Sequence, residues 1–484
     1  MWKPPERIEF TPDPGPWPTA KEARASRLFS PVKIGPVTLE QRTWIPAMVP
    51  WRATGEGEVS QDVIDWYARF AKGRPGAIVI EATGIRDIPS GPLLRIGDDR
   101  YIEGLSRLVE AVRKASGGHT RLFIQLIDFL AVRRRPAKAK FFESHLAITD
   151  EHRAHLAGES DAAIRTALAA MDDKTLRDVL SDREFDSYSR GYRERVTDTH
   201  LPHVADLPEK LPAMFAAAAL RAKRAGFDGV ELHYAHAYTM ASFLSALNTR
   251  TDGYGGPREN RVKLPLEVYR AVRQAVGEDY PVGCRMLTED CIEGGSELAD
   301  TSWFAMQFAA SGMDFISFSR GGKFEDALTP APGQAIYPYT GPSGYECMPH
   351  YISDERGPFG RNRPAVAAIR QALRDAGHQV PVVLAGGIHG FQQAEQYLRE
   401  GEADIIGMAR QTLADPDWFA KVASGHGSQT RQCKYSNYCE GLDQKHKIVT
   451  CQLWDREALD EPGAPLTPDG KRRMVAPEWT PPAP

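Results

Sequence analysis

Short apolar segments alternate with helical segments along this chain of 484 residues, and this alternation limits the possible folds more than any other feature. The apolar segments are continuous, which is typical of parallel strands covered by helices on both faces. Strands are predicted at residues 42–48, 76–81, 121–126, 229–233, 282–286, 314–318, 382–385 and 403–407. Helices are predicted at residues 61–72, 101–115, 210–225, 260–276, 297–311, 363–376, 391–400 and 415–423. Such a series of strand–helix units is what a (β/α)8 TIM barrel requires, and its active site lies at the carboxyl ends of the strands.

A doubly wound α/β sheet shows the same alternation, but its dinucleotide fingerprint is missing. The nearest candidate, Gly55-Glu56-Gly57, is followed by Ser60 where the third glycine belongs. The sequence therefore predicts an α/β barrel, with a mainly helical insertion at about 127–207 after strand three and a loop insertion at 320–359 after strand six. Residues 1–28 are expected to form an extended proline-rich arm, 29–425 the barrel, and 426–484 a cysteine-containing extension with a proline-rich tail.

Composition limits the class of protein. The net charge is -4, 26% of the residues are charged, and the mean hydropathy is -0.42, which are ordinary values for a globular protein. No apolar run approaches the roughly 20 residues of a membrane helix, and the first residues lack the pattern of a signal peptide. We therefore expect a cytoplasmic protein with reduced cysteines and with no nucleic acid or membrane partner.

Two histidines and a tyrosine follow the fourth predicted strand. His233, His236 and Tyr238 could together hold an anionic oxygen and supply a proton. The histidines could instead bind zinc in a metal-dependent barrel hydrolase, although no third ligand is evident. Either histidine alone could also be an ordinary core residue.

Glycine-rich loops follow the last two strands. Gly386 and Gly387 come after strand seven, and Gly407, Ala409 and Arg410 come at the end of strand eight. Barrels commonly bind phosphate here, because exposed backbone N–H groups and a helix N-terminus favour an anion. Arg410 would pair with that phosphate. Either loop alone could be a tight turn, but the two together predict a phosphate site.

Gln125 and Arg285 lie at the ends of strands three and five. The amide can donate and accept hydrogen bonds at the polar edge of a bound ring, and the guanidinium would stabilise negative charge that develops there. Taken singly, each could be a core amide or an ion-pair partner.

The segment from Gly226 to Arg261, with its HYAHAY run and NTRTDGYGG loop, resembles the core signature of the old yellow enzyme family of flavin-dependent ene-reductases. The similarity extends from about Arg27 to Ala423. It implies FMN as cofactor and NAD(P)H as electron donor. It assigns flavin contacts to Ala47, Met48, Ala82, Gln125, Arg285, Gly386, Gly387, Gly407, Ala409 and Arg410. Trp51 and Tyr67 are candidate walls of the substrate pocket, although aromatic packing explains them equally well.

The resemblance also implies a reaction. His233 and His236 would bind the oxygen of an activated alkene, flavin N5 would deliver hydride to the β-carbon, and Tyr238 would give a proton to the α-carbon. The substrate would be a small α,β-unsaturated carbonyl compound or thioester, and a homo-oligomer is possible. Alternatives are a flavin-dependent dehydrogenase or demethylase of an amine or cyclic substrate, the metal-dependent hydrolase, and a flavin-binding regulatory or scaffold subunit.

Some positions depart from the family pattern. Val49 stands where a Thr or Cys commonly hydrogen-bonds the flavin, so an altered flavin potential is expected. Ala409 replaces a glycine, which requires a negative φ. The run from Arg133 to Lys140 is basic and is either a solvated surface or a contact for NADPH or a CoA substrate. The insertion at 320–359 is expected to roof the pocket and to influence specificity.

Three cysteines near the C-terminus, Cys433, Cys439 and Cys451, resemble a remnant of the iron–sulfur segment of 2,4-dienoyl-CoA reductase-like members. Ser436 stands where a further cysteine belongs. Iron–sulfur clusters are held by four thiolates, so an intact cluster is not expected. A three-thiolate zinc site is a further possibility.

Overall fold

The computed structural model describes residues 12–88, 91–156, 160–348 and 359–482, and its centre is a closed barrel of parallel strands. The order around the barrel is β10-β3-β4-β5-β6-β7-β8-β9. The strands are β3 (Thr43–Ile45), β4 (Ala77–Gly84), β5 (Arg121–Ile127), β6 (Gly229–Tyr234), β7 (Val282–Leu287), β8 (Ile316–Ser319), β9 (Val382–Ala385) and β10 (Ile405–Gly407). The predicted TIM barrel is confirmed.

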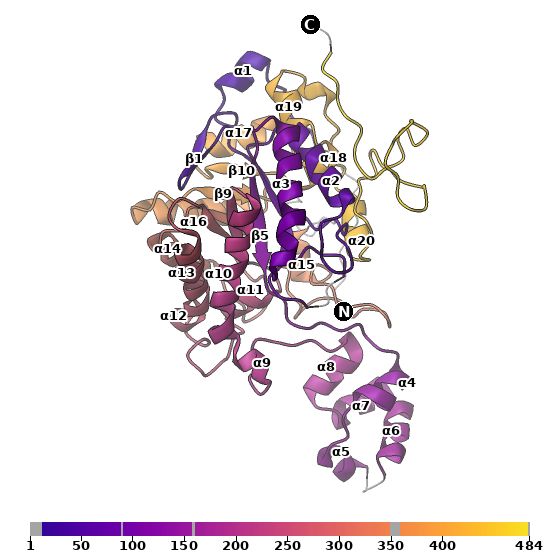
Figure 1. The fold of residues 1–484 in the computed structure, drawn as a ribbon. Helices are drawn as coiled ribbons and strands as arrows, with labels where there is room; N and C mark the ends of the chain where they lie inside the picture. The colour runs from indigo at the N-terminus through magenta and orange to yellow at the C-terminus, as the bar shows by residue number, and fades with distance from the viewer. Residues whose placement is uncertain (1–11, 89–90, 157–159, 349–358, 483–484) are drawn as a thin grey trace.

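Helices surround the barrel on the outside (Figure 1). They are α2 (Gln61–Lys72), α3 (Ile102–Ser116), α10 (Leu207–Ala225), α13 (Lys263–Val276), α14 (Leu298–Ala310), α16 (Arg363–Asp375), α17 (Phe391–Arg399), α18 (Arg410–Ala414) and α19 (Trp418–Ala423). Shorter helices are η1 (Asp99–Tyr101), α11 (Thr239–Leu244) and α12 (Arg258–Arg261). Along the described residues, no helix is both long enough and apolar enough to cross a membrane.

Aromatic side chains fill the amino-terminal end of the barrel interior. The rings of Trp44, Phe123 and Phe315 lie 5.0 to 5.4 Å apart between centroids. Glycines on two strands make room for them, because a Cβ at Gly229 would lie 2.5 Å from Phe123 and one at Gly283 would lie 2.4 Å from Phe315. This end is closed, so a ligand enters the barrel from the carboxyl ends of the strands.

Polar side chains form the next layer above this aromatic plug. Side chains two residues apart on a strand point to the same side, so Gln125 follows Phe123 and Glu231 follows Gly229 into the interior. The parallel register pairs Gln125 with Glu231 and His233 with Arg285. The barrel thus changes from apolar to polar toward its carboxyl end.

The insertion after β5 is helical, as predicted, and has its own apolar core. Its elements are α4 (Lys138–Lys140), η2 (Phe141–His145), α5 (Asp150–His155), α6 (Asp161–Ala170), α7 (Asp173–Val179), α8 (Asp182–Arg190) and α9 (Pro202–Ala205). Phe142, Ile164, Leu168 and Leu176 are almost fully buried together, in a cluster separate from that of the barrel. Figure 1 shows α4 to α8 as a group beside the barrel.

The predicted extended arm at residues 1–28 is partly wrong. Residues 1–11 lie outside the described part, and α1 (Ala20–Ala25) is a helix within the arm. Thr19 and Glu22 cap its first turn reciprocally, a pattern that the sequence itself contains. An unpredicted antiparallel hairpin, β1 (Val32–Ile34) and β2 (Val37–Leu39), follows.

The predicted helix at 415–423 is wrong over its first residues. The chain forms α18 and then α19, with Asp415 in extended conformation between them. Pro416 disfavours helical geometry at the residue before it. The predicted helix at 260–276 similarly divides into α12 and α13.

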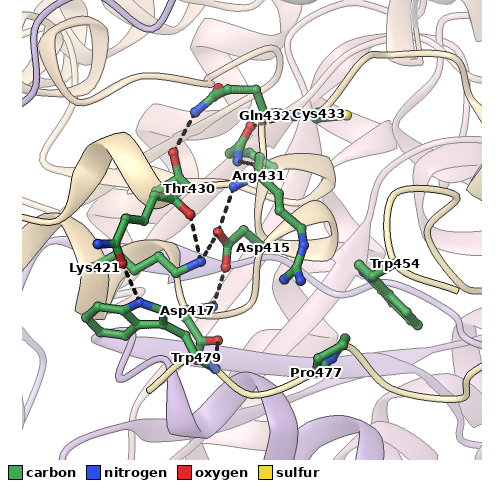
Figure 2. A network of polar contacts seen from close by, with 12 residues as sticks. Asp415, Asp417, Lys421, Thr430, Arg431, Gln432, Cys433, Trp454, Pro477 and Trp479 are labelled. Atoms are coloured by element: carbon green, nitrogen blue, oxygen red, sulfur yellow. Dashed lines mark hydrogen bonds and ion pairs between the residues drawn. The ribbon is translucent and has the colours of Figure 1, made fainter. Parts of the chain in front are cut away.

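The C-terminal extension packs on the barrel. It contains η3 (Gly427–Gln429) and α20 (Tyr438–Asp443). A further helix, α15 (Pro342–Cys347), belongs instead to the insertion after β8. Figure 2 shows a buried ion pair between Lys421 Nζ and Asp415 Oδ2 at 2.6 Å. The Trp479 indole donates to Gln429 Oε1 at 2.7 Å, and the carbonyl of the same Gln429 accepts from Lys421. The tail is therefore attached through specific polar contacts.

Candidate active site

The two histidines and the tyrosine that follow β6 lie together at the carboxyl end of the barrel. The ring centroids of His233 and His236 are 5.3 Å apart, and those of His233 and Tyr238 are 5.6 Å apart. His236 has a φ of 62°, which turns the chain sharply after the strand. Its Nε2 lies 2.9 Å from Ser319 Oγ at the end of β8. Side chains from two strands thus converge on one place.

Burial keeps both imidazoles uncharged. Desolvation, together with the nearby Arg285, lowers the pKa of His233 to about 3. The same causes and the charge of Lys323 lower the pKa of His236 well below its usual value. Among the described residues, His233 Nδ1 is buried without a hydrogen-bond partner. Neutral imidazoles with an unused polar atom can hydrogen-bond a ligand oxygen.

Tyr238 stays protonated. Burial raises its pKa above the ordinary value, and the charge of Asp443 adds to this effect, while a hydrogen bond with Tyr339 opposes it. The Tyr238 ring meets Phe129 edge to face, with 5.2 Å between centroids. The phenol is therefore available as a proton donor over the physiological pH range.

A cavity of about 310 Å³ opens beside Tyr238. It lies between α11, residues 190–197 of the insertion, and residues 323–325 after β8. Its apolar lining includes Phe129, Leu130, Val132, Ala237, Leu247 and Phe324, and its charged lining includes Arg190, Arg193, Glu194, Arg195, Lys323 and Glu325. A small organic molecule fits this volume.

A polar layer lies below the histidines. Gln125 donates through Nε2 to Glu231 Oε2 at 2.5 Å, and Arg285 donates through Nη1 to Ser317 Oγ at 3.3 Å. Glu231 Oε1 is buried and has no hydrogen-bond partner among the described residues. Burial raises the pKa of Glu231, and the charge of Arg285 opposes this. The amide of Gln125 and the guanidinium of Arg285 can therefore hydrogen-bond the polar edge of a flat ring that binds above this layer.

The glycine loops after β9 and β10 bring backbone close to the same end of the barrel. Gly386 has a φ of 121° and Gly387 one of 65°, which side chains rarely permit. A Cβ at Gly386 would lie 2.7 Å from Asn362 Nδ2, which donates to the Ala385 carbonyl. Ala409 has a φ of -97°, as its replacement of a glycine requires.

Arg410 lies against the C-terminal extension. Its Nη1 donates to Asn437 Oδ1 at 2.7 Å, and its guanidinium lies 4.7 Å from the centre of the Tyr435 ring. It follows directly on the loop after β10, so its position agrees with a phosphate ligand, while its orientation depends on residues 435–437.

The remaining predicted contacts divide into two groups. Ala47, Met48 and Ala82 are partly exposed at the ends of β3 and β4. Tyr67 is buried, and its hydroxyl donates to Glu81 Oε2 at 3.1 Å, so it belongs to the barrel wall. Trp51 is stacked on His446 and donates to Asp443 Oδ1 of α20 at 2.5 Å.

Four residues near the site carried no assignment from the sequence: Glu231, Ser319, Lys323 and Tyr339. Glu231 could have been found, because it precedes His233 by two positions on the same strand. The Tyr339 ring lies 5.4 Å from that of His236, so the insertion after β8 does reach the histidines. That contact depends on the path of a long loop, which no local pattern predicts.

The three C-terminal cysteines share a small cavity of about 20 Å³, together with Ser436 and Arg410. This space holds about one water molecule and does not fit an iron–sulfur cluster. Burial raises the pKa of all three thiols. Within the described ranges, no group of three potential ligands has the geometry of a metal site. These cysteines have no part in the function proposed below.

The model of the NADH:flavin oxidoreductase / NADH oxidase family matches residues 206–343 and 361–429. The matched part of the chain belongs to this family. The matched residues include the histidine pair, Tyr238, Arg285 and both glycine loops, so the family similarity falls on the candidate site.

Individual members of the family match over most of the chain. A metal reductase of Desulforamulus reducens is 32% identical over 448 residues, which are 92% of this chain and 55% of that protein. An NADPH dehydrogenase of Halalkalibacterium halodurans is 29% identical over 403 residues, 82% of this chain and 94% of that protein. The old yellow enzyme homologue of Zymomonas mobilis shares the fold, with a TM-score of 0.54 at 20% identity over 93% of this chain and 99% of that one. The chain spans about half the length of the first curated relatives that it matches.

Proposed function

We propose that this chain is an FMN-dependent oxidoreductase that takes electrons from NAD(P)H and reduces the activated C=C bond of a small unsaturated carbonyl compound or thioester. The observation that carries this proposal is the convergence of two neutral histidines on a protonated tyrosine, Tyr238, which lines a cavity of about 310 Å³. The NADPH dehydrogenase among the relatives supports the nicotinamide donor.

The residues present fit FMN. The glycine loops after β9 and β10 offer backbone to a phosphate, and the unpaired Glu231 Oε1 lies in a layer suited to a flat polar ring. Gln125 and Arg285 would hold the ring, Ala47, Met48 and Ala82 would pack on it, and Gly386, Gly387, Gly407, Ala409 and Arg410 would hold the phosphate. Bound FMN would carry electrons from NAD(P)H to the substrate as hydride.

The chain's own residues would orient and protonate the substrate. His233 and His236 would donate hydrogen bonds to the oxygen that is conjugated with the C=C bond. These bonds strengthen as negative charge develops on that oxygen, which favours the transition state over the bound substrate. Tyr238 would give its proton to the α-carbon, and its raised pKa keeps that proton in place until the carbon becomes basic.

The visible spectrum tests this proposal. The purified protein should carry flavin absorption that disappears on anaerobic addition of NADH or NADPH and returns on addition of 2-cyclohexenone. A colourless protein that takes up no FMN would contradict it and would favour the metal-dependent hydrolase. Flavin that an amine or another oxidisable substrate reduces, and that enones do not reoxidise, would favour the dehydrogenase. Flavin that neither NAD(P)H nor such a substrate reduces would favour a subunit without turnover.

A further inference from the structure

A turn of two glycines after β8 packs directly on His236, one of the two histidines. Gly321 and Gly322 have φ values of 58° and 78°. A Cβ at Gly322 would lie 2.7 Å from the Tyr339 ring and 3.3 Å from Cδ2 of His236. Only glycine permits this approach, and the turn directs the next residue, Lys323, into the cavity beside Tyr238.

Lys323 is a buried cation with unused hydrogen-bond donors. It is 2% exposed. Its Nζ lies 3.1 Å from Asp290 Oδ1, but in a direction that makes no hydrogen bond, and it has no acceptor among the described residues. Oδ2 of Asp290 is already occupied by the Ser245 hydroxyl at 2.6 Å and the Ser296 amide at 2.9 Å. An ammonium has three donors, and leaving them unmatched in a buried place is costly.

The other charged residues of the cavity have partners. Arg193 is paired with Glu325 at 3.1 Å, and Arg195 with Asp186 at 3.0 Å. Arg190 donates to the carbonyl oxygens of Phe324 at 2.8 Å and Ala327 at 2.5 Å. Nε of Arg190 and Nε of Arg195 are also buried without a partner, but each of these guanidinium groups makes other hydrogen bonds. Among the described lining cations, Lys323 is therefore the one whose charged group makes no hydrogen bond.

We propose that Lys323 binds a second acceptor oxygen on the substrate, at a place other than the oxygen that the histidines hold. The inference rests on the function proposed above and specifies its substrate class: unsaturated carbonyl compounds that also carry a carboxylate or a further carbonyl group. Lys323 and Tyr238 line one cavity, so a single small molecule can reach both. The apolar side formed by Phe129, Leu130 and Phe324 would hold the carbon skeleton between the two oxygens.

Three alkenes of one skeleton test this inference: 2-cyclohexenone, 4-oxocyclohex-2-ene-1-carboxylate and the methyl ester of the latter. The rate constant and the apparent Kd for reoxidation of the reduced protein are measured by stopped flow for wild type and K323M. Wild type should bind the carboxylate or the ester at least about 10-fold more tightly than 2-cyclohexenone, and K323M should abolish that preference, because a hydrogen bond to a charged group is lost. A loss confined to the carboxylate identifies an anionic group, and a loss for both compounds identifies any acceptor oxygen.

Three further variants separate a binding role from a structural one. K323R keeps a cation and should retain part of the preference. R195M removes a cation of the same cavity that is paired with Asp186 and half-exposed, and it should change the preference less than about 3-fold. The double variant K323M/D290N leaves no unpaired buried charge, so it should fold and should still lack the preference. Flavin content and circular dichroism check the fold of each variant.

The outcomes distinguish the two proposals. If none of the three alkenes reoxidises the reduced wild-type protein, the proposed ene-reduction fails. If all three do so, but the preference is absent in wild type or persists in K323M and K323M/D290N, only the assignment of Lys323 is overturned.

Discussion

The tyrosine beside the histidine pair can be tested by removing one oxygen atom. Tyr238→Phe keeps the ring against Phe129 and removes the proton donor. We expect reoxidation of the reduced flavin by an enone to slow by about 100-fold or more, because a positioned acid contributes on that order. Reduction of the flavin by NAD(P)H should be unchanged. Stopped-flow measurement of the two half-reactions separates these effects.

A second phenol provides the control. Tyr254 lies on the loop between α11 and α12, and its hydroxyl donates to Glu267 Oε2 at 3.2 Å. Tyr254→Phe should leave both half-reactions unchanged within about 2-fold. Equal slowing of both half-reactions by Tyr238→Phe would show that the tyrosine has a structural role instead.

Glu81 makes stability depend on pH. It is fully buried, and desolvation raises its pKa to about 8, against the hydrogen bond from Tyr67 and the charge of Arg52. Between the unfolded pKa of about 4.5 and the folded pKa of about 8, the folded protein holds a proton that the unfolded chain has released. Folding stability is therefore lost as the pH rises through this window, by at most about 1.4 kcal/mol per pH unit.

Glu81→Gln removes this dependence. The stability of E81Q relative to wild type, measured by urea unfolding of the apoprotein, should increase from pH 5 to pH 8. Glu103→Gln, at an exposed position of α3, should show no such trend. A difference between E81Q and wild type that is constant with pH would mean that Glu81 ionises normally.

At the scale of the elements, a feature could be predicted from the sequence where neighbouring residues determine it, and could not where contacts between distant segments determine it. The strands and most helices follow from apolar periodicity, and α2 begins and ends where predicted. The capping box of α1 and the proline at 416 are also local signals, because each acts on residues next to it in the sequence. The pairing of Gln125 with Glu231 is different, because it requires the register between two strands.

The candidate site shows the same division. His233, His236 and Tyr238 come from one continuous segment, so their proximity could be predicted from the sequence. Lys323 is 85 residues further along the chain than Tyr238, and its place beside the histidines depends on the closure of the barrel and on the packing of a glycine turn. Such contacts arise only when separate strands are brought together.

The helical insertion should be removable as a unit. Helices α4 to α8 bury their apolar residues mainly against one another, and the insertion is closed at its base, where Arg133 N donates to the Tyr192 carbonyl at 2.8 Å. Replacing residues 137–188 by two glycines should therefore leave a folded barrel that binds FMN and is reduced by NAD(P)H. Flavin fluorescence and thermal unfolding measure these properties.

The same deletion should affect the substrate side. Residues 190–197, which line the cavity, remain but lose the support of α8. We expect a higher apparent Kd for the enone and an unchanged rate of flavin reduction. Loss of FMN binding would show that the barrel needs the insertion to fold.

At the scale of the whole molecule, the C-terminal extension holds the walls of the candidate site. Asp443 of α20 accepts from Trp51 and from Tyr337, and the Tyr337 ring lies 5.2 Å from that of Tyr339, next to His236. Arg52, near the end of β3, donates to the carbonyl of Val449 at 2.9 Å. The extension therefore links the first strand of the barrel with the loop that follows β8.

The attachment of this extension depends on a few buried charges. Asp415 accepts from Lys421 Nζ at 2.6 Å and from the backbone amide of Arg431 at 2.8 Å. Both side chains of the ion pair are almost fully buried (Figure 2). A buried pair contributes little net stability, but removing one partner leaves a charge without compensation.

Asp415→Asn should destabilise the protein by about 3–5 kcal/mol, because the buried charge of Lys421 would lose its counter-ion and keep only uncharged acceptors, such as the Gln429 carbonyl at 3.1 Å. The double variant D415L/K421M should recover most of this loss, since it leaves no buried charge. The exposed pair of Lys72 and Glu478 joins the same tail to α2, and Lys72→Met should cost at most about 1 kcal/mol. Urea unfolding measures these free energies of unfolding, and flavin fluorescence measures the FMN affinity.

If the extension holds the site walls, D415N should weaken FMN binding and D415L/K421M should restore it. Weaker FMN binding in both variants to the same extent would assign the effect to Asp415 itself.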